Sequence, residues 1–388
     1  MSTFDPQVID NPMLRAAFST LQSEYPESKE SLFRYIGMDG EIKPEPSIPT
    51  GSVALDKAIG IGGIPKGRLT IISGEYSTGK TTLCLGIIKN QVLIDPKKTN
   101  LYFDFETGAF TESYVQNMGE MLGPNQLIIS EPDYLQQAME VAYRLISTGQ
   151  IGVCVFDSIA GAYTKEASEK SAEKSNSIAG VPRVLSDNLG KLCSKCGKTG
   201  TALVFVNQLR TQMGNTFSWI DISGGKTQKF MASLWIELEQ KDKIKKYDGS
   251  QNQARIIAKI KKNKVGNPFG SAEFDIMFGV GIIKESSILD QAIDSGIIQQ
   301  AGAGWFTLFD ITTGEEIVKL QGRPVVLQYL RDNPDYCDEI EQSILGYERD
   351  TTYQQEVELG EDSLGIEDKL EKEVEKVEEK EIKLEAKE

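Results

Sequence analysis

The octapeptide GEYSTGKT, from Gly74 to Thr81, stands between the apolar run RLTIIS and the helix-like run TTLCLGIIKNQVL. It fits the pattern G-x-x-x-x-G-K-[S/T], in which glycines let backbone N–H groups turn toward phosphate oxygens at a helix N-terminus. Lys80 can reach the β and γ oxygens of ATP, and the Thr81 hydroxyl can ligate Mg²⁺. The octapeptide and the residue after it therefore predict ATP contacts at Gly74, Glu75, Tyr76, Ser77, Thr78, Gly79, Lys80, Thr81 and Thr82.

Carboxylates end two further apolar runs, GVCVFDS and LYFDFETGAF. The carboxyl ends of parallel strands face one crevice, so we expect these carboxylates beside the phosphate loop. Asp157 is the predicted Mg²⁺ partner, through water; a helix N-cap is the alternative role, and Ser158 would serve equally well as that cap. Hydrolysis also needs a group that orients water. Either Asp104 or Glu106 can do this, and Glu106 is the better candidate.

The composition limits the remaining chemistry. There is no histidine among the 388 residues, which excludes histidine-based acid, base or metal chemistry. Five cysteines predict no disulfide framework, and Cys84 and Cys154 lie in apolar runs typical of buried thiols. Cys193 and Cys196 form a CxxC in a predicted helix that ends at Gly197. We interpret this pair as structural, with a metal or redox role as the alternative.

Charge is distributed unevenly along the chain. The net charge is −15, and residues 361–388 hold 12 acidic residues and 6 lysines, a difference of −6. Because the rest of the chain is acidic as well, any nucleic acid must bind in a local groove rather than on a basic surface. No apolar run approaches the roughly 20 residues of a membrane helix, and no secretion signal begins the chain. We therefore expect a cytoplasmic protein with no membrane partner.

Apolar runs alternate with helix-like segments through the middle of the chain. This alternation predicts an α/β fold with a largely parallel sheet. The expected strands are 68–73, 100–105, 152–156 and 202–207, with 233–239 and 255–261 extending the same sheet. The expected regions are an N-terminal helix and arm at 1–46, a nucleotide-binding core at 47–282, a small helical or α+β domain at 283–347, and a disordered acidic tail at 348–388.

Taken in order, several motifs resemble those of the bacterial RecA recombinase family. They are IPTGSVALDKAIGIGGIPKGR before the phosphate loop, DFETGAF, VCVFDSIA, VFVNQLR, ISGGKTQKF and KKNKVGNPFGSAEFDIMFGVGI. The resemblance covers about residues 10 to 345 and leaves a host or a phage origin open. It implies a RecA-type phosphate-loop ATPase core, an N-terminal polymerisation arm and a small C-terminal domain.

The resemblance also implies roles for single residues. Glu106 matches the family's catalytic glutamate, which selects it over Asp104. Gln208 matches the glutamine that senses the γ-phosphate and couples it to the DNA-binding loop that follows; taken alone, it would be a loop cap. Lys262 and Lys264 match lysines that reach the ATP of the neighbouring subunit, and without the resemblance they would be surface lysines.

Further matches concern the nucleotide base and the contact between subunits. Tyr114 resembles the aromatic residue that stacks on adenine. Phe278 and Gly279 resemble a purine contact contributed from later in the core. Lys229 and Phe230 match the subunit-interface motif of the family.

Two segments, 165–184 and 210–226, resemble the family's first and second DNA-binding loops. The implied DNA contacts are Ile178, Arg183, Arg210, Met213, Gly214, Asn215, Phe217, Gly224 and Gly225. The alternatives are a solvated helix face for the Glu- and Lys-rich run 165–174, and packing onto the core for the apolar residues of the second loop. The chain departs from the family at Glu239 and Gln240, where the family has an arginine pair of a secondary DNA site.

The resemblance implies a recombinase that forms an ATP- and Mg²⁺-dependent filament of its own copies on single-stranded DNA. The filament would pair this strand with homologous double-stranded DNA, assisted by single-strand-binding and loader proteins. One alternative is a hexameric RecA-fold helicase or motor, which would lack the trailing domain. Another is an ATP- and DNA-binding regulator without strand exchange, which would not need Glu106 and Lys80.

Overall fold

In a computed structural model, the described residues are 12–24, 46–106, 122, 125–168, 180–213, 218–244, 253–277 and 280–346. The first of these ranges contains helix α1 (Pro12–Glu24), inside the region expected to form an N-terminal helix and arm. Within the described ranges, no helix is both long and apolar enough to cross a membrane.

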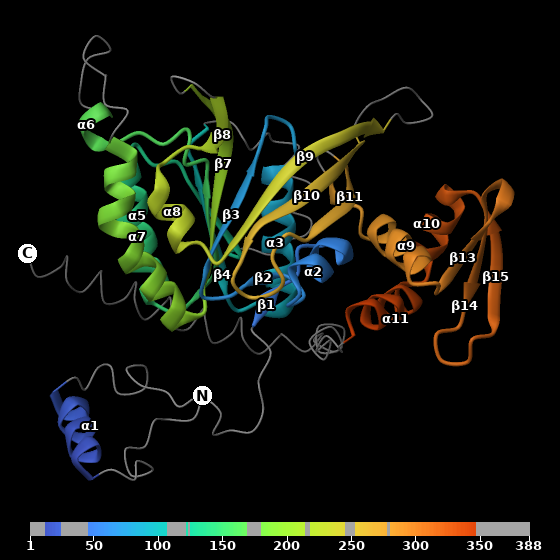
Figure 1. The fold of residues 1–388 in the computed structure, drawn as a ribbon, viewed down its shortest axis with the longest axis horizontal. Helices are drawn as coiled ribbons and strands as arrows, with labels where there is room; N and C mark the ends of the chain where they lie inside the picture. Colours follow the sequence, from blue (N-terminus) through green and yellow to red (C-terminus); the bar gives the residue numbers. More distant parts are fainter. Residues whose placement is uncertain are drawn as a thin grey trace, which may run out of the picture.

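A large sheet organises the core (Figure 1). Its strand order is β12-β11-β10-β9-β3-β7-β6-β4-β5, and β8 pairs with β7 outside this path. Neighbours from β9 to β5 are parallel, whereas β10, β11 and β12 pair in antiparallel fashion. The strands are β3 (Leu69–Gly74), β4 (Thr99–Asp104), β5 (Leu127–Ser130), β6 (Ile151–Asp157), β7 (Ala202–Met213), β8 (Ser218–Ile222), β9 (Leu234–Ile244), β10 (Gln253–Asn263), β11 (Ser271–Met277) and β12 (Gly281–Ile282).

Helices cover both faces of this sheet, which explains why its central strands are apolar throughout. Ile71 and Ile72 of β3 are both fully buried, yet they belong to different hydrophobic clusters because successive side chains of a strand face opposite sides. Helices α2 (Val53–Ile59) and α3 (Lys80–Ile94) pack on one face, and α5 (Leu135–Ser147) and α7 (Gly180–Thr199) pack on the other. The predicted α/β fold is confirmed.

One segment differs clearly from the sequence-based expectation. Strand β7 continues past residue 207 to Met213 and pairs with β8, so much of the expected flexible DNA-binding loop is a β-hairpin. The side chain of Ile222 is 3% exposed and lies in the core, so packing accounts for this apolar residue of the loop. The β-branched and aromatic residues of β8 favour a strand. The glycine and asparagine residues of the same segment favour a flexible loop, which is why the strand is not expected from the sequence.

A smaller unit follows the core, drawn in orange and red in Figure 1. It combines a three-stranded antiparallel sheet with three helices, which makes it an α+β unit with its own hydrophobic cluster. Val53 of α2 belongs to this cluster, so the core contributes to the packing of the smaller unit. Its elements are α9 (Lys284–Asp294), β13 (Ile298–Ala301), β14 (Trp305–Phe309), β15 (Glu316–Gln321), α10 (Arg323–Asp332) and α11 (Pro334–Leu345).

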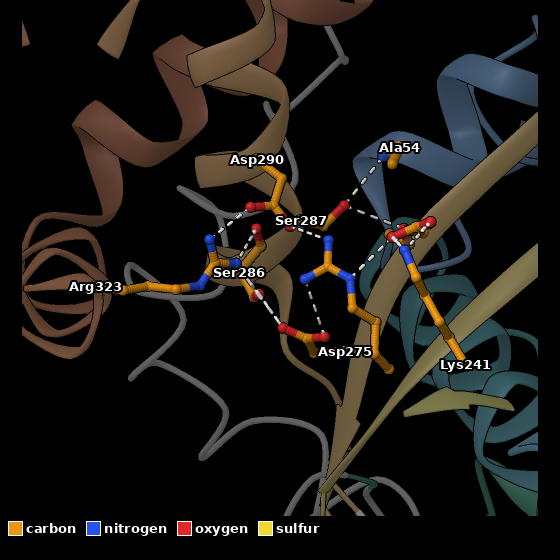
Figure 2. Close-up of polar contacts among 10 residues, drawn as sticks. Ala54, Lys241, Asp275, Ser286, Ser287, Asp290 and Arg323 are labelled. Carbon is orange, nitrogen blue, oxygen red and sulfur yellow. Dashed lines mark hydrogen bonds and ion pairs between the residues drawn. The ribbon is translucent and has the colours of Figure 1, made fainter. Parts of the chain in front are cut away.

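An ion-pair network joins the two units (Figure 2). Asp290 of α9 accepts from Arg255 of β10 at 2.7 Å and from Arg323 of α10 at 2.6 Å. Arg255 also contacts Asp275, which is buried, and Ser287 accepts a hydrogen bond from the backbone N–H of Ala54 at 3.1 Å. Because one carboxylate is shared by an arginine of each unit, the network fixes their relative position.

Candidate nucleotide site and DNA-coupling region

The phosphate loop lies between β3 and α3, at the carboxyl edge of the sheet. Gly79 precedes the helix with a φ of 81°, a left-handed conformation that favours glycine. A Cβ atom on Gly74 would lie 2.6 Å from the Leu238 carbonyl oxygen, so a larger residue does not fit there. The first N–H groups of α3 lack intrahelical partners and face the loop, which makes the segment suited to an anion.

Lys80 begins α3 and folds over the loop. Its Nζ donates to the carbonyl oxygen of Glu75 at 2.6 Å. Burial lowers the pKa of Lys80, and the nearby carboxylates of Asp157 and Glu106 counteract this effect. The side chain is therefore a partly desolvated cation beside two carboxylates, and phosphate oxygens can compete for it.

Asp157 ends strand β6 next to the first turn of α3. Its Oδ2 accepts from the Thr81 hydroxyl at 2.7 Å and from the Tyr102 hydroxyl. Burial raises the pKa of Asp157, while the hydrogen bonds from Tyr102 and Thr81 lower it. These contacts are not those of a helix N-cap. A buried carboxylate beside a helix-terminal hydroxyl supplies the oxygen ligands that Mg²⁺ prefers, so the residues fit the expected metal.

Glu106 follows strand β4 and contacts Ser158, which follows β6, and Gln208, which lies within β7. Its Oε1 accepts from Gln208 Nε2 at 2.6 Å and from the Ser158 hydroxyl at 2.7 Å. Asp104 has a different partner, because its Oδ1 accepts from the backbone N–H of Glu106 at 2.8 Å. Asp104 thus shapes the turn that presents Glu106 to solvent.

Two residues of this site escaped the sequence analysis as functional groups. Tyr102 lies inside an apolar strand, where a tyrosine is usually part of the core, and its hydroxyl contact with Asp157 depends on β4 and β6 being neighbours. From its position after a strand, Ser158 is expected only as a helix cap, whereas its hydroxyl donates to Glu106 in the structure. The alternation of Tyr102 with Asp104 along the strand was the available signal, and it is weak.

Lys262 and Lys264 lie at the opposite edge of the sheet from the phosphate loop. Lys262 Nζ donates to the carbonyl oxygens of Lys229 and Phe230 at 2.6 and 3.1 Å, and Lys264 Nζ donates to that of Phe230 at 3.2 Å. The backbone N–H of Lys264 donates to Ser233, next to the start of β3. Strand β3 separates this position from the phosphate loop. Its length is about 16 Å, at roughly 3.3 Å per residue.

Four residues assigned to the interface thus gather in one place, at the end of helix α8 (Lys226–Met231). Phe230 is 72% exposed, an unusual value for a large apolar side chain. Lys229 pairs with Asp221 of the hairpin and lies 5.7 Å from the ring centroid of Trp235. The two pairs are in contact, since Lys262 and Lys264 donate to backbone carbonyl groups of Lys229 and Phe230.

Among the expected DNA-binding residues that the structure describes, Arg210 and Met213 lie in the hairpin, and Gly224 and Gly225 follow it and approach the start of α7, where Arg183 lies. Arg183 lies in the first turn of α7, with a largely exposed side chain 4.0 Å from Asp187. Gly224 and Gly225 have φ values of 89° and 80°, and a Cβ on Gly225 would lie 3.0 Å from Pro182 of α7. These glycines therefore allow the end of the second predicted DNA-binding loop to approach the start of α7, the helix that follows the first predicted loop.

Several predicted site residues lie outside the described residues. They are Tyr114, Ile178, Gly214, Asn215, Phe217, Phe278 and Gly279. For Arg210 and Met213 the structure describes the backbone, which pairs with Asp221 and Ser218 of β8. Their roles, like that of the tail at 348–388, stay predictions.

The CxxC pair and the departure from the family pattern at Glu239 both lie in regular elements of the core. Cys193 and Cys196 lie in α7, and burial raises the pKa of the Cys193 thiol to about 11. Such thiols are protonated at neutral pH, and the thiolate is the form that binds metal. Glu239, at the departure from the family pattern, pairs with Lys259 of β10 at 2.6 Å.

The sheet, and the residues at its carboxyl edge, are those of an α/β ATPase of the phosphate-loop class. Two family models narrow it: residues 13–283 match the RecA N-terminal domain, and residues 286–347 match the RecA C-terminal domain. The chain belongs to the RecA family. The C-terminal match disfavours a hexameric helicase, which would lack this trailing domain.

Curated relatives agree with the family models. The chain is 37% identical to the RecA protein of Bifidobacterium breve over 341 residues, which cover 86% of this chain and 82% of the relative. It is 38% identical to the RecA protein of Acidothermus cellulolyticus, covering 83% of this chain and 89% of the relative. As a family member, the chain is a DNA-dependent ATPase of recombination and repair that binds nucleotide and forms homo-oligomers.

Proposed function

We propose that the chain assembles on single-stranded DNA as a helical filament with ATP and Mg²⁺, and exchanges that strand into a homologous duplex. The observation that carries this proposal is the 2.6 Å hydrogen bond between Gln208 and Glu106. It connects a carboxylate suited to activating water with the strand that continues into the hairpin of the second DNA-binding loop. Catalysis and DNA binding therefore share one strand.

The loop from Gly74 to Thr81 would hold the phosphates of ATP through its backbone N–H groups, with Lys80 moving from the Glu75 carbonyl to the β and γ oxygens. Thr81 would ligate Mg²⁺ directly and Asp157 through water. When bound, Mg²⁺ neutralises charge on the phosphate oxygens. Tyr102 would orient the Asp157 carboxylate by donating a hydrogen bond to it.

Hydrolysis would use Glu106 to orient a water molecule and accept its proton at a carboxylate oxygen. Gln208 and Ser158 both donate to Oε1 of this carboxylate, which fixes its position. If Gln208 turned toward a γ-phosphate, its amide N–H groups would leave Glu106, and Oε1 would be open to the attacking water. The same movement displaces the strand that leads to the hairpin.

Lys262 and Lys264 would complete the site of a neighbouring protomer rather than their own. They lie about 16 Å from the phosphate loop of the same chain, by the length of β3, and a lysine side chain does not span that distance. Placed against a neighbour, each would supply a cation to the γ-phosphate, as an arginine finger does. Hydrolysis would then require filament contacts.

The remaining partners follow from the same proposal. Tyr114, Phe278 and Gly279 would hold the adenine, and Ile178, Arg183, Met213 and Phe217 are among the proposed DNA contacts. Single-strand-binding and loader proteins are proposed accessory partners, and a cytoplasmic location stays a prediction. A regulator without strand exchange is the second candidate, but it would have no use for the Glu106 and Gln208 pair.

The proposal is tested by measuring ATPase activity with and without single-stranded DNA, together with electron microscopy of the same samples. We expect DNA to stimulate hydrolysis and filaments to form with ATP. The Glu106→Gln variant should form filaments and bind DNA but lose hydrolysis. Closed rings with no DNA stimulation would favour a helicase and contradict the proposal, whereas filaments without strand exchange would favour the regulator.

A further inference from the structure

Helix α8 lies at the meeting point of three regions of the molecule. Its N-terminus follows the hairpin of the second DNA-binding loop directly, through Gly224 and Gly225. Its last carbonyl groups accept hydrogen bonds from the two lysines proposed to reach the neighbouring protomer. Its flank contacts α7 through the Thr227 hydroxyl, which lies 2.8 Å from that of Ser186. A displacement of α8 would therefore change contacts in all three regions.

Gln228 occupies the middle of this helix and is fully buried. Its Oε1 accepts from Asn207 Nδ2 at 2.8 Å, and its Nε2 donates to the carbonyl oxygen of Ser223. Asn207 is the residue before Gln208 on β7, and Ser223 is the residue after the hairpin ends. One amide thus connects the residue before Gln208 on β7 with the residue that follows β8 at the base of the hairpin.

The chemistry of the partners sets the orientation of the Gln228 amide. A carbonyl oxygen can only accept, so Nε2 must face Ser223, and Oε1 then faces the donor nitrogen of Asn207. A Cβ atom on Gly224 would lie 2.7 Å from Nε2, so the glycine at this position lets the hairpin end approach the amide. The contact between Gln228 and Ser223 therefore depends on the backbone conformation at Gly224 and on the close packing of the glycine against the amide.

The same network has hydrogen-bonding capacity that its described neighbours leave unused. Asn207 Oδ1 and the Ser223 hydroxyl are buried, and neither has a hydrogen-bond partner within the part of the chain that the structure describes. Buried polar groups without partners are costly, so an arrangement that pairs them would be favoured over this one. The network is therefore suited to a second arrangement when Gln208 or the hairpin changes position.

We infer that Gln228 is a positioning residue that couples the nucleotide state at Gln208 to the DNA-binding hairpin and, through α8, to the lysines of the subunit contact. This inference rests on the proposed function and adds a residue to it. Gln228 contacts neither ATP nor the reacting water. Its loss should leave DNA-independent hydrolysis intact and weaken the dependence of hydrolysis on DNA.

The test compares Gln228→Leu with the full-length parent in two measurements. The first is the ratio of ATPase kcat with single-stranded DNA to kcat without it. The second is the ratio of Kd values for single-stranded DNA with ADP and with a slowly hydrolysed ATP analogue. The Kd ratio reports the coupling in binding and the kcat ratio reports it in hydrolysis, so both ratios should fall, each by about tenfold. A purely structural role would lower the melting temperature and leave both ratios unchanged.

Gln91→Leu is the matched control, because Gln91 is also a fully buried glutamine in a helix. Neither amide atom of Gln91 has a hydrogen-bond partner in the described ranges. The same substitution there should keep both ratios at the parent values. Gln228→Glu serves as a second variant if Gln228→Leu fails to fold: a carboxylate can accept from Asn207 but cannot donate to Ser223. It should also lower both ratios.

The outcomes separate this inference from the proposed function. If the parent shows no stimulation of hydrolysis by DNA, the proposed function itself fails. If the parent is stimulated and a folded Gln228→Leu or Gln228→Glu variant keeps both ratios, the coupling role is refuted. If Gln91→Leu lowers the ratios as much as Gln228→Leu does, a general effect of core substitution explains the result, and the inference is overturned.

Discussion

Mixing two inactive variants tests whether each ATP site is shared between protomers. Glu106→Gln keeps both lysines but lacks the base, and the double variant Lys262→Ala/Lys264→Ala keeps the base but lacks the cations. Each variant alone should have little DNA-stimulated hydrolysis. Because the lysines and the phosphate loop lie at opposite ends of β3, a complete site can form where a lysine-deficient protomer meets a Glu106→Gln protomer in the correct orientation.

The expected recovery follows from this geometry. In a filament assembled at random from equal amounts of the two variants, half of the protomers carry Glu106 and half of their neighbours carry the lysines. About one quarter of all sites are then complete, since a head-to-tail contact gives each site one neighbour. Hydrolysis should approach about a quarter of the parent rate and fall on either side of the equal mixture.

The assay is DNA-stimulated ATP hydrolysis across mixing ratios, with total protein constant and filament formation checked by microscopy. The control mixes Glu106→Gln with Lys80→Ala, a pair in which both variants lack a group of the same phosphate site. That mixture should stay inactive at every ratio. Recovery in the control, or no recovery in filaments that contain both test variants, would refute the assignment of the lysines to a neighbouring site.

Three further predictions concern the site and the junction. Tyr102→Phe removes a hydrogen bond to a buried carboxylate, worth about 2 kcal/mol, and should weaken Mg²⁺-dependent ATP binding by roughly 30-fold, whereas Tyr163→Phe at an exposed tyrosine should not. The raised pKa of Asp157 means that its contribution to stability is present below the ordinary pKa of 3.8 and is lost as the pH rises through the raised value. Asp157→Asn should therefore raise the melting temperature of the nucleotide-free protein, increasingly so as the pH rises above 3.8, while abolishing hydrolysis; a difference that does not grow with pH would contradict the sign. Asp290→Asn leaves two partly buried arginines without their shared carboxylate and should cost about 3 kcal/mol in the unfolding free energy measured with urea, and equal stability would show that the junction does not depend on it.

The sequence predicted the parts of the site that depend on local patterns. The phosphate loop needs a strand, two glycines and a helix in succession, and all of these are adjacent in the chain. Parallel strands bring their carboxyl ends to one edge, which placed Asp157 and Glu106 together before the strand order was known. The family resemblance selected Glu106 over Asp104, and this choice stays a prediction; in the structure Glu106 accepts from Gln208, whereas Asp104 accepts from the backbone of Glu106.

The parts that were missed depend on contacts between distant segments. The Tyr102 hydroxyl reaches Asp157 because β4 and β6 are neighbours, an order that no local pattern specifies. Gln228 was unremarkable in the sequence, since a glutamine in a short helix is usually exposed. Its burial depends on the packing of α8 against β7 and the hairpin end. The hairpin was missed because strand pairing beyond residue 207 competes with the flexibility that the glycines suggest.

The separation of the phosphate loop and the lysine pair at opposite ends of β3 also makes the two ends of an assembly unequal. A filament of such protomers would expose an ATP site lacking lysines at one end and lysines lacking an ATP site at the other. The terminal site could bind nucleotide but would hydrolyse it slowly. Growth and shrinkage would then proceed at different rates at the two ends, giving the filament a direction along the DNA strand.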